Sequence, residues 1–169
     1  SKWVKPEFLD ITSSRVQNVT VVHPDGSRMI VSRAGKKKFK ITNMPQNMVV
    51  EYQSDIDNMG DGLEKLELED VVAAGTIKFP RDEIITTRIT TNDGLVMNVK
   101  MIDVNDGNFW AVFDAEFELT ASDTVKKEAS LINSRVSKWA YELPAHKYRY
   151  MSRKHSDVLK KPKIQKKNK

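Results

Sequence analysis

Two Asp-Gly dipeptides, Asp25-Gly26 and Asp93-Gly94, lie 68 residues apart, and each separates two runs of alternating apolar residues. Asp-Gly supplies the positive backbone angles that tight hairpin turns require. Alternation of apolar and polar residues on both sides of such a turn is typical of two antiparallel strands with one buried face. The sequence therefore predicts two β-hairpins in corresponding positions of two similar segments.

Each predicted hairpin is followed by a third strand-like run and then by a helical pattern. The third runs are Phe39–Ile41 and Phe109–Phe113. We therefore expect an α+β fold with two similar units, each of three antiparallel strands followed by a helix, and a C-terminal helix. The units cover about residues 11–75 and 84–143 and the last helix covers 144–160, all within a single domain of residues 1–159.

The helix of the first unit has an unusual composition. Ser54 can cap a helix that carries apolar residues at helical spacing, namely Ile56, Met59, Leu63 and Leu66. Gly60 and Gly62 lie inside it, and each costs about 1 kcal/mol relative to alanine in a helix interior. We therefore expect that packing holds this segment, or that its backbone lies close to a neighbouring element.

The second unit has stronger patterns. The strand at 109–117 is apolar on both faces, so we expect it to be central in the sheet. A helix is predicted to begin after Ser122 or Asp123, with apolar residues at Val125, Ala129, Ile132, Val136 and Trp139. A short extended stretch, 140–143, ends at Pro144, which is well suited to start the last helix.

Charge is concentrated at the C-terminus. The formal net charge is +5, but residues 160–169 contain six lysines and no acidic residue. Without this tail the chain has 22 basic and 23 acidic residues, so the predicted domain is nearly neutral. We expect a disordered basic tail and no nucleic-acid binding, because no basic face accompanies it.

Residues able to perform catalysis or bind metal are few. The chain has no cysteine, which excludes disulfides and thiolate sites. Of its three histidines, His146 and His155 are nine positions apart and point to opposite sides of the predicted helix, while His23 is expected to face solvent. Residues 103–108 resemble the start of a calcium loop, but the glycine comes one residue early, which favours a polar turn. We therefore expect a non-enzymatic protein with no catalytic residue, no metal and no cofactor.

The acidic segment that follows the first helix is a candidate binding surface. Glu64, Glu67, Glu69 and Asp70 flank apolar residues, and we interpret the acids as a solvated face rather than a catalytic pair. Leucine, valine and acidic residues alternate here as in an exposed strand, which favours docking of a protein partner along its edge. The candidate docking residues are Leu66, Leu68, Glu69, Asp70 and Val71.

An alternative is a cleft between the two units that binds a small ligand, such as a sugar, peptide or ion, or performs a minor hydrolytic reaction. Interfaces between repeated units are natural places for a pocket. The candidate groove aromatics are Trp139, Tyr141 and Tyr148, although such residues at strand and helix spacing are more often part of a core.

Four segments, in this order, resemble the bacterial domain-of-unknown-function family 4340. They are DITSSRVQNVTVVHPDGSRMIVSR at 10–33, LEKLELEDVVAA at 63–74, TTNDGLVMNV at 90–99 and INSRVSKWAYELPAHKYRYMSRKHSDVL at 132–159. The resemblance covers residues 3–159, and its most specific parts are Trp139–Pro144 and Leu66–Val71.

This resemblance implies an accessory role beside ABC-type export or gliding-motility transporter components. It also implies a domain on the periplasmic face of the bacterial inner membrane, held by an N-terminal anchor upstream of Ser1. The partners expected from it are transporter proteins. The chain departs from the family pattern in Gly60, Gly62 and the lysine tail.

Overall fold

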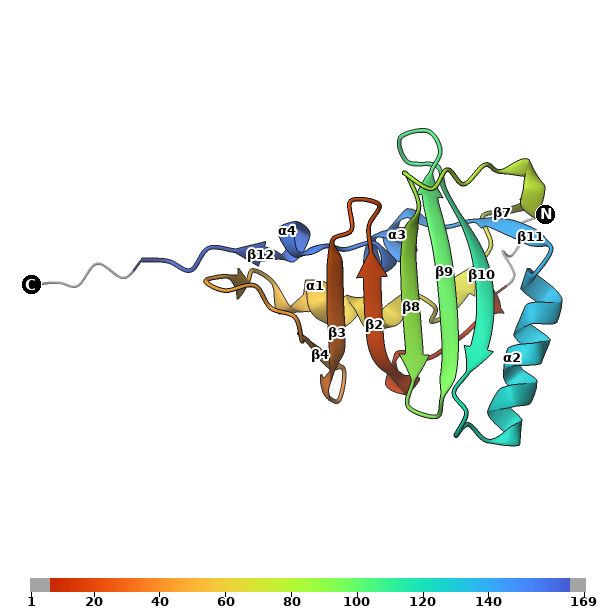
Figure 1. The fold of residues 1–169 in the computed structure, drawn as a ribbon, viewed down its shortest axis with the longest axis horizontal. Helices are drawn as coiled ribbons and strands as arrows, with labels where there is room; N and C mark the ends of the chain where they lie inside the picture. The colour runs from red at the N-terminus through yellow and green to blue at the C-terminus, as the bar shows by residue number, and fades with distance from the viewer. Residues whose placement is uncertain (1–6, 165–169) are drawn as a thin grey trace, which may run out of the picture.

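The computed structural model describes residues 7–164, which form one large antiparallel sheet with helices and short strands packed behind it (Figure 1). The sheet has eight strands in the order β4-β3-β2-β8-β9-β10-β11-β7. The strands are β2 (Val16–Val22), β3 (Arg28–Gly35), β4 (Lys38–Ile41), β7 (Asp70–Ala73), β8 (Ile85–Thr91), β9 (Leu95–Asp103), β10 (Phe109–Phe117) and β11 (Trp139–Glu142). The predicted α+β class with antiparallel strands is confirmed.

One face of the sheet is covered by helices and by two small two-stranded sheets. The helices are α1 (Gln53–Asp57), α2 (Asp123–Val136), α3 (Ala145–Met151) and α4 (His155–Val158), with 3-10 turns η1 (Ser13–Arg15), η2 (Asn58–Asp61) and η3 (Ala74–Thr76). The small sheets pair β1 (Glu7–Leu9) with β6 (Leu66–Glu67), and β5 (Val49–Val50) with β12 (Leu159–Lys160). Residues 1–6 and the end of the basic tail, 165–169, lie outside the described residues.

Both hairpin turns lie where the dipeptides predict them. Only the glycines have positive φ, +86° at Gly26 and +94° at Gly94, so the expectation that Asp-Gly supplies both positive angles is wrong for the aspartates. The N–H of Gly26 donates to the carbonyl of His23 at 2.9 Å, and that of Gly94 to the carbonyl of Thr91 at 3.2 Å. A turn followed by one left-handed glycine needs positive φ at only one residue.

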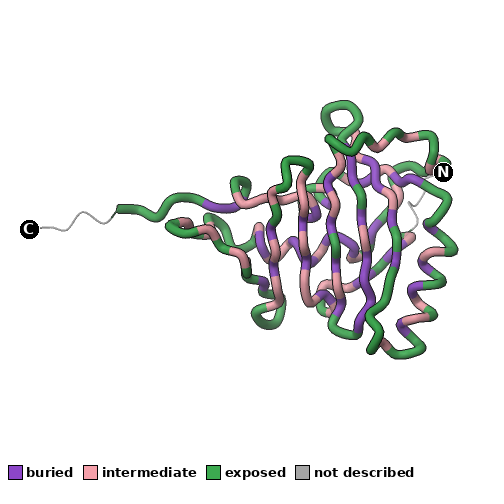
Figure 2. The backbone as a smooth tube through the Cα atoms, in the orientation of Figure 1, coloured by how far each residue is buried: buried purple, intermediate pink, exposed green. Residues whose placement is uncertain are grey.

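The composition of the core follows from the alternation of buried and exposed side chains along each strand. Residues such as Val19, Val21 and Val31 point to the covered face and are fully buried, while their neighbours stay partly exposed (Figure 2). The predicted central strand, β10, lies between β9 and β11 and buries Ala111 on the covered face. On the opposite face Trp110 packs with Ile102 and Ala140 in a second cluster, which explains its two apolar faces.

The first predicted helix is shorter than expected. It begins after Tyr52 rather than Ser54, without a side-chain cap, and gives way to the 3-10 turn η2, while Leu66 belongs to strand β6. The close approach predicted from the glycines is confirmed. A Cβ atom on Gly60 would lie 2.5 Å from the Phe39 ring, and one on Gly62 would lie 2.4 Å from Met151 Cγ.

The C-terminal elements confirm one helix and correct another. Helix α2 begins after Ser122, whose hydroxyl accepts the N–H of Val125 at 3.3 Å, but Trp139 belongs to β11 instead of the helix. The single helix expected at 144–160 is divided into α3, α4 and the short strand β12. At the break, the carbonyl of Met151 accepts from the hydroxyl of Thr87 on β8, and the carbonyl of Ser152 is bonded by His23 Nε2 at 2.8 Å.

Candidate functional site

The two outer edges of the sheet are treated differently, and this difference defines the candidate site. At the β4 edge, the outward N–H of Phe39 donates to Asp57 Oδ1 at 3.0 Å. The outward carbonyl of Phe39 accepts from Gln53 Nε2 at 2.8 Å. Both partners belong to helix α1, so its side chains bind the outward backbone groups of Phe39, in the way that natural proteins protect sheet edges from association.

Strand β7 forms the other edge and pairs only with β11 in the described part of the chain. The N–H of Ala74 donates to the carbonyl of Lys138 at 2.9 Å, which sets the ladder so that Val71 and Ala73 direct their backbone groups away from β11. The N–H of Val71 is bonded by the adjacent Asp70 carboxylate at 2.8 Å. A local carboxylate, which an incoming strand can displace, therefore occupies part of this edge.

The predicted docking residues differ in their exposure to solvent. Leu66 has an exposed fraction of 0% and lies in the main core, so the expectation that it contacts a partner is wrong. Leu68 is half-buried against the same core. Glu69, Asp70 and Val71 are exposed, with Val71 at 41%. Leu66 faces inward because β6 pairs with β1 above the core, a contact that alternation alone did not reveal.

The three predicted groove aromatics do not share a groove. Tyr141 is buried and stacks on Phe8 with ring centroids 4.4 Å apart, and its hydroxyl donates to the carbonyl of Arg135 at 3.1 Å. Tyr148 stacks on Phe109 at 3.9 Å. Burial raises the pKa of both tyrosine hydroxyls. Trp139 is 44% exposed and lies opposite Ala73, so it adds apolar surface beside the β7 edge.

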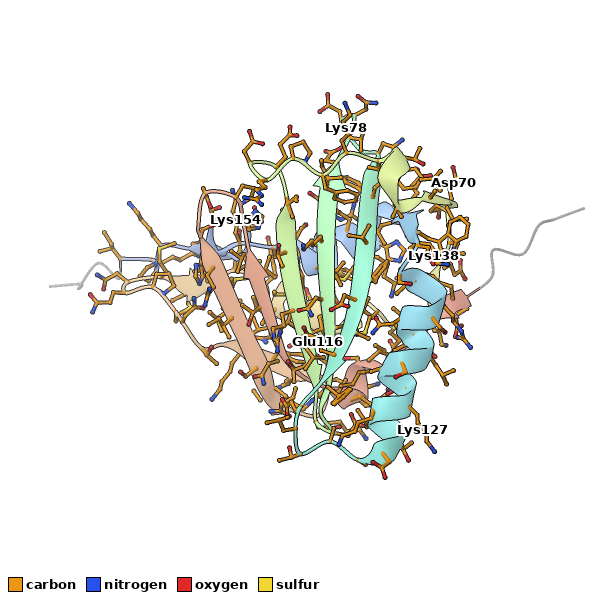
Figure 3. All side chains as sticks on the ribbon, turned by 45° about the vertical axis from the view of Figure 1, so that its right-hand side comes forward. Asp70, Lys78, Glu116, Lys127, Lys138 and Lys154 are labelled. Carbon is orange, nitrogen blue, oxygen red and sulfur yellow. The ribbon has the colours of Figure 1, made fainter. Side chains whose placement is uncertain are left out.

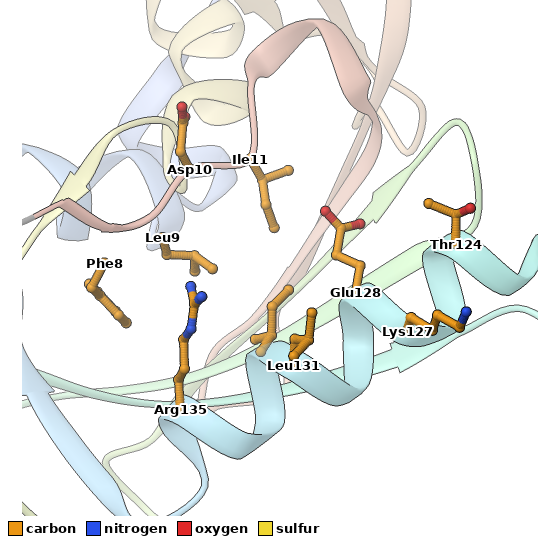
Figure 4. A pocket seen from close by; sticks show the side chains of 10 residues that line it. Phe8, Leu9, Asp10, Ile11, Thr124, Lys127, Glu128, Leu131 and Arg135 are labelled. Atoms are coloured by element: carbon orange, nitrogen blue, oxygen red, sulfur yellow. The ribbon is translucent and has the colours of Figure 1, made fainter.

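A groove between β1 and helix α2 was missed by the sequence analysis (Figure 4). Its volume is about 420 Å³. Apolar side chains of Phe8, Leu9, Ile11, Leu131 and Ile132 line it together with charged side chains, of which Asp10, Lys127, Glu128 and Arg135 are examples. No sequence signal marked it, because its two walls are more than 100 residues apart.

An ion-pair hub lies beside this groove. Arg15 donates to both oxygens of Glu128, at 3.0 and 2.8 Å, and to Asp93 Oδ2 at 3.0 Å. The hydrogen bond from Glu128 raises the pKa of Arg15. Burial acts to raise the pKa of Asp93, but hydrogen bonds from Thr91 and Arg15 and the charge of Arg15 outweigh it and lower that pKa. The hub joins the second hairpin turn to helix α2.

Lys147 is a buried cation that the sequence did not predict. Its Nζ donates to the backbone carbonyls of Asp61, at 2.7 Å, and Glu64. Burial lowers the pKa of Lys147 and raises the pKa of the nearby Asp61. The carbonyls belong to the end of η2 and the turn after it, where backbone oxygens lack helical partners. Lys147 therefore has a structural role.

The other residues considered for catalysis or metal binding lie apart from one another. His23 is half-buried and bonded to Ser152, so the expectation that it faces solvent is wrong. The 103–108 segment forms the predicted polar turn, in which the N–H of Gly107 donates to Asp103 Oδ1 at 3.0 Å. Within residues 7–164, histidine, aspartate and glutamate side chains do not gather into a group of three able to hold a metal ion.

Comparison of the chain with protein-family models, curated proteins and solved structures finds no match. The helices among residues 7–164 are too short or too polar to cross a membrane. The function is therefore argued from the sheet edge and the surfaces beside it.

Proposed function

We propose that the protein is a non-enzymatic interaction domain that binds a protein partner by strand addition along β7. The observation that carries this proposal is the asymmetry of the sheet edges. Helix α1 closes the β4 edge through Asp57 and Gln53, while the described chain places no strand beyond β7. Strand addition derives affinity from main-chain hydrogen bonds and specificity from side chains beside the edge.

The side chains beside β7 favour a partner with a particular composition. Val71 and Trp139 offer exposed apolar surface, and Glu69 and Asp70 carry negative charge. A partner strand that places an apolar residue near Val71 and a lysine or arginine near Asp70 would complement both features.

We extend the proposal to the cellular context that the resemblance implies. The domain acts as an accessory of an ABC-type transporter system at the periplasmic face of the bacterial inner membrane. This is supported by the resemblance to family 4340, which consists of four segments that follow one another in the same order between residues 10 and 159.

We also propose that residues 11–75 and 84–143 are two copies of one unit. The order of elements supports this, because β2, β3 and β4 precede α1 while β8, β9 and β10 precede α2. Each unit opens on a hairpin with a left-handed glycine.

Site-specific photocrosslinking in cells of the organism of origin tests the docking edge. A photoreactive residue at Ala73, on β7, is expected to form adducts with a protein partner, whereas one at Lys40, on β4, is not. Val71→Pro removes an outward N–H without breaking the ladder to β11 and blocks strand addition, while Val71→Thr serves as the matched control.

The expected result is loss of adducts in Val71→Pro alone, with thermal unfolding of both variants close to that of the parent. Equal crosslinking from both edges, or adducts that persist in Val71→Pro, would contradict strand addition.

A further inference from the structure

Helix α2 presents an outer face on which basic and apolar side chains alternate. Lys127, Leu131 and Arg135 follow one another at four-residue spacing and are exposed, so they share one side of the helix. Leu131 has an exposed fraction of 60%. Lys138 continues this face just beyond the end of the helix, and Figure 3 shows Lys127 and Lys138 near its two ends.

Apolar residues from the neighbouring turn enlarge this face. Leu119, in the connection between β10 and α2, is 95% exposed. Phe117 lines a depression of about 540 Å³ with Lys126, Lys127 and Leu131. The Nζ atom of Lys126 lies 5.6 Å from the centre of the Phe117 ring. Leu131 also lines the groove on the other side of the helix, so it lies on the ridge between two depressions.

The charge of this face is positive. Its basic residues are Lys126, Lys127, Arg135 and Lys138, and its acidic residues are Glu118 and Asp123. Glu128, on the same helix, is held by a two-fold contact with Arg15 of η1, which also pairs with Asp93. We name the α2 surface as the residues Phe117, Leu119, Lys126, Lys127, Leu131, Arg135 and Lys138.

We propose that the α2 surface binds an anionic lipid membrane. Interfacial helices combine basic residues with leucine and aromatic side chains, and the basic groups contact lipid headgroups while the apolar groups enter the headgroup boundary. Lysine and arginine stems lie along apolar surface and keep their charges in water. Leu119 on a turn and Leu131 on a convex ridge can enter a lipid interface, which accepts side chains without a shaped pocket. An acidic protein would meet the same charges but would need pockets for both leucines.

Sedimentation with lipid vesicles tests this proposal without a protein partner, so its outcome is independent of strand addition at β7. Vesicles of phosphatidylcholine alone are compared with vesicles of phosphatidylcholine and phosphatidylglycerol. The full chain is used with its tail lysines replaced by glutamine, because the tail is itself basic. Lys160 is kept because it belongs to strand β12, and the replaced residues are Lys161, Lys163, Lys166, Lys167 and Lys169.

This tail-neutral protein is expected to bind only the phosphatidylglycerol vesicles, and less tightly as salt is added. Lys127→Glu/Lys138→Glu is expected to weaken binding about tenfold or more, since each basic group near an anionic surface contributes strongly. Leu119→Ser/Leu131→Ser is expected to weaken it similarly. The matched controls are Lys78→Glu/Lys100→Glu and Val104→Ser, which change exposed residues elsewhere and should bind like the parent.

Three results would overturn the proposal. Binding by the tail-neutral protein could be absent, which would assign any membrane affinity to the tail. The control charge reversal could weaken binding as much as the α2 reversal, which would indicate net charge alone. Poly-glutamate peptide could bind in an α2-dependent manner while vesicles do not, which would assign the surface to an acidic protein. Circular dichroism melts of all variants exclude loss of folding as the cause.

Discussion

Replacing Gly60 by alanine should destabilise the protein, although helix propensity predicts the opposite. Gly60 has no positive φ, so alanine fits its backbone, and propensity alone would give a gain of about 1 kcal/mol. The new Cβ atom, however, would lie 2.5 Å from Cε2 and 2.7 Å from Cζ of Phe39. Carbon atoms pack best at about 3.5–4.0 Å, so the ring must move by about 1 Å.

Phe39 has little room to move. Its ring is buried in the main core, and its backbone is held by Asp57 and Gln53. Overpacking of this kind costs about 1–3 kcal/mol. The upper end of this range applies to a rigid ring. After the propensity gain is subtracted, the free energy of unfolding falls by about 2 kcal/mol, which corresponds to about 4–8 °C in Tm for a chain of this size.

Urea unfolding followed by circular dichroism measures this loss, and Gly75→Ala is the matched control. Gly75 also lies in a 3-10 turn, and a Cβ atom there meets nothing within 4 Å, so this variant should be neutral or slightly more stable. Gly60→Ala/Phe39→Leu should lose less than the sum of its single changes, because the smaller side chain makes room. Equal stability of Gly60→Ala and Gly75→Ala would refute the argument that close approach selects glycine here.

Three further predictions concern charged and packed groups. Arg15→Ala should lower the free energy of unfolding by about 1–2 kcal/mol, because Arg15 joins Glu128 and Asp93. In the same urea assay Arg88→Ala, which removes the more exposed pair with Glu116, should lower it by under about 0.5 kcal/mol. The pKa of Asp93 is below its ordinary value of 3.8, so the stability it contributes is complete above that pH and is lost as the pH falls through the folded-state pKa. Asp93→Asn should therefore flatten the dependence of stability on pH below about 3.8, and an unchanged acid profile would contradict this. Lys147→Met should cost about 1–3 kcal/mol, because it leaves the carbonyls of Asp61 and Glu64 without their donor, and a variant as stable as the parent would show that these contacts contribute nothing.

Local features of the fold were predictable because they depend on local chemistry. The hairpin turns follow from glycine, the only residue type that adopts positive φ without steric cost. Helix α2 follows from a cap and a periodic apolar face. The glycines of the η2 segment indicated close approach correctly, because a residue that weakens a helix needs a compensating reason.

The parts that were not predictable depend on contacts between distant residues. Strand β7 pairs with β11 although nearly 70 residues separate Val71 from Tyr141, and nothing in either segment specifies the other. The same limit explains the wrong prediction for Leu66. Its alternation with acidic residues fits an exposed strand, and only the pairing of β6 with the distant β1 shows that it is buried. No local pattern marks Lys147 as buried, because the carbonyls that bind it belong to another element.

The side-chain contacts at β4 explain why it is informative that β7 has no second strand beside it among residues 7–164. Phe39 links both arguments, since its ring excludes a side chain at Gly60 while its backbone groups are bound by α1. Helix α1 is followed directly by η2, so the segment that binds the β4 edge also carries the glycine that the Phe39 ring requires. Free strand edges promote aggregation, and proteins usually block them. Within residues 7–164, helix α1 binds backbone groups at one edge of the sheet, while the other edge is a short strand with a local carboxylate, and this asymmetry supports the strand addition that we propose at β7.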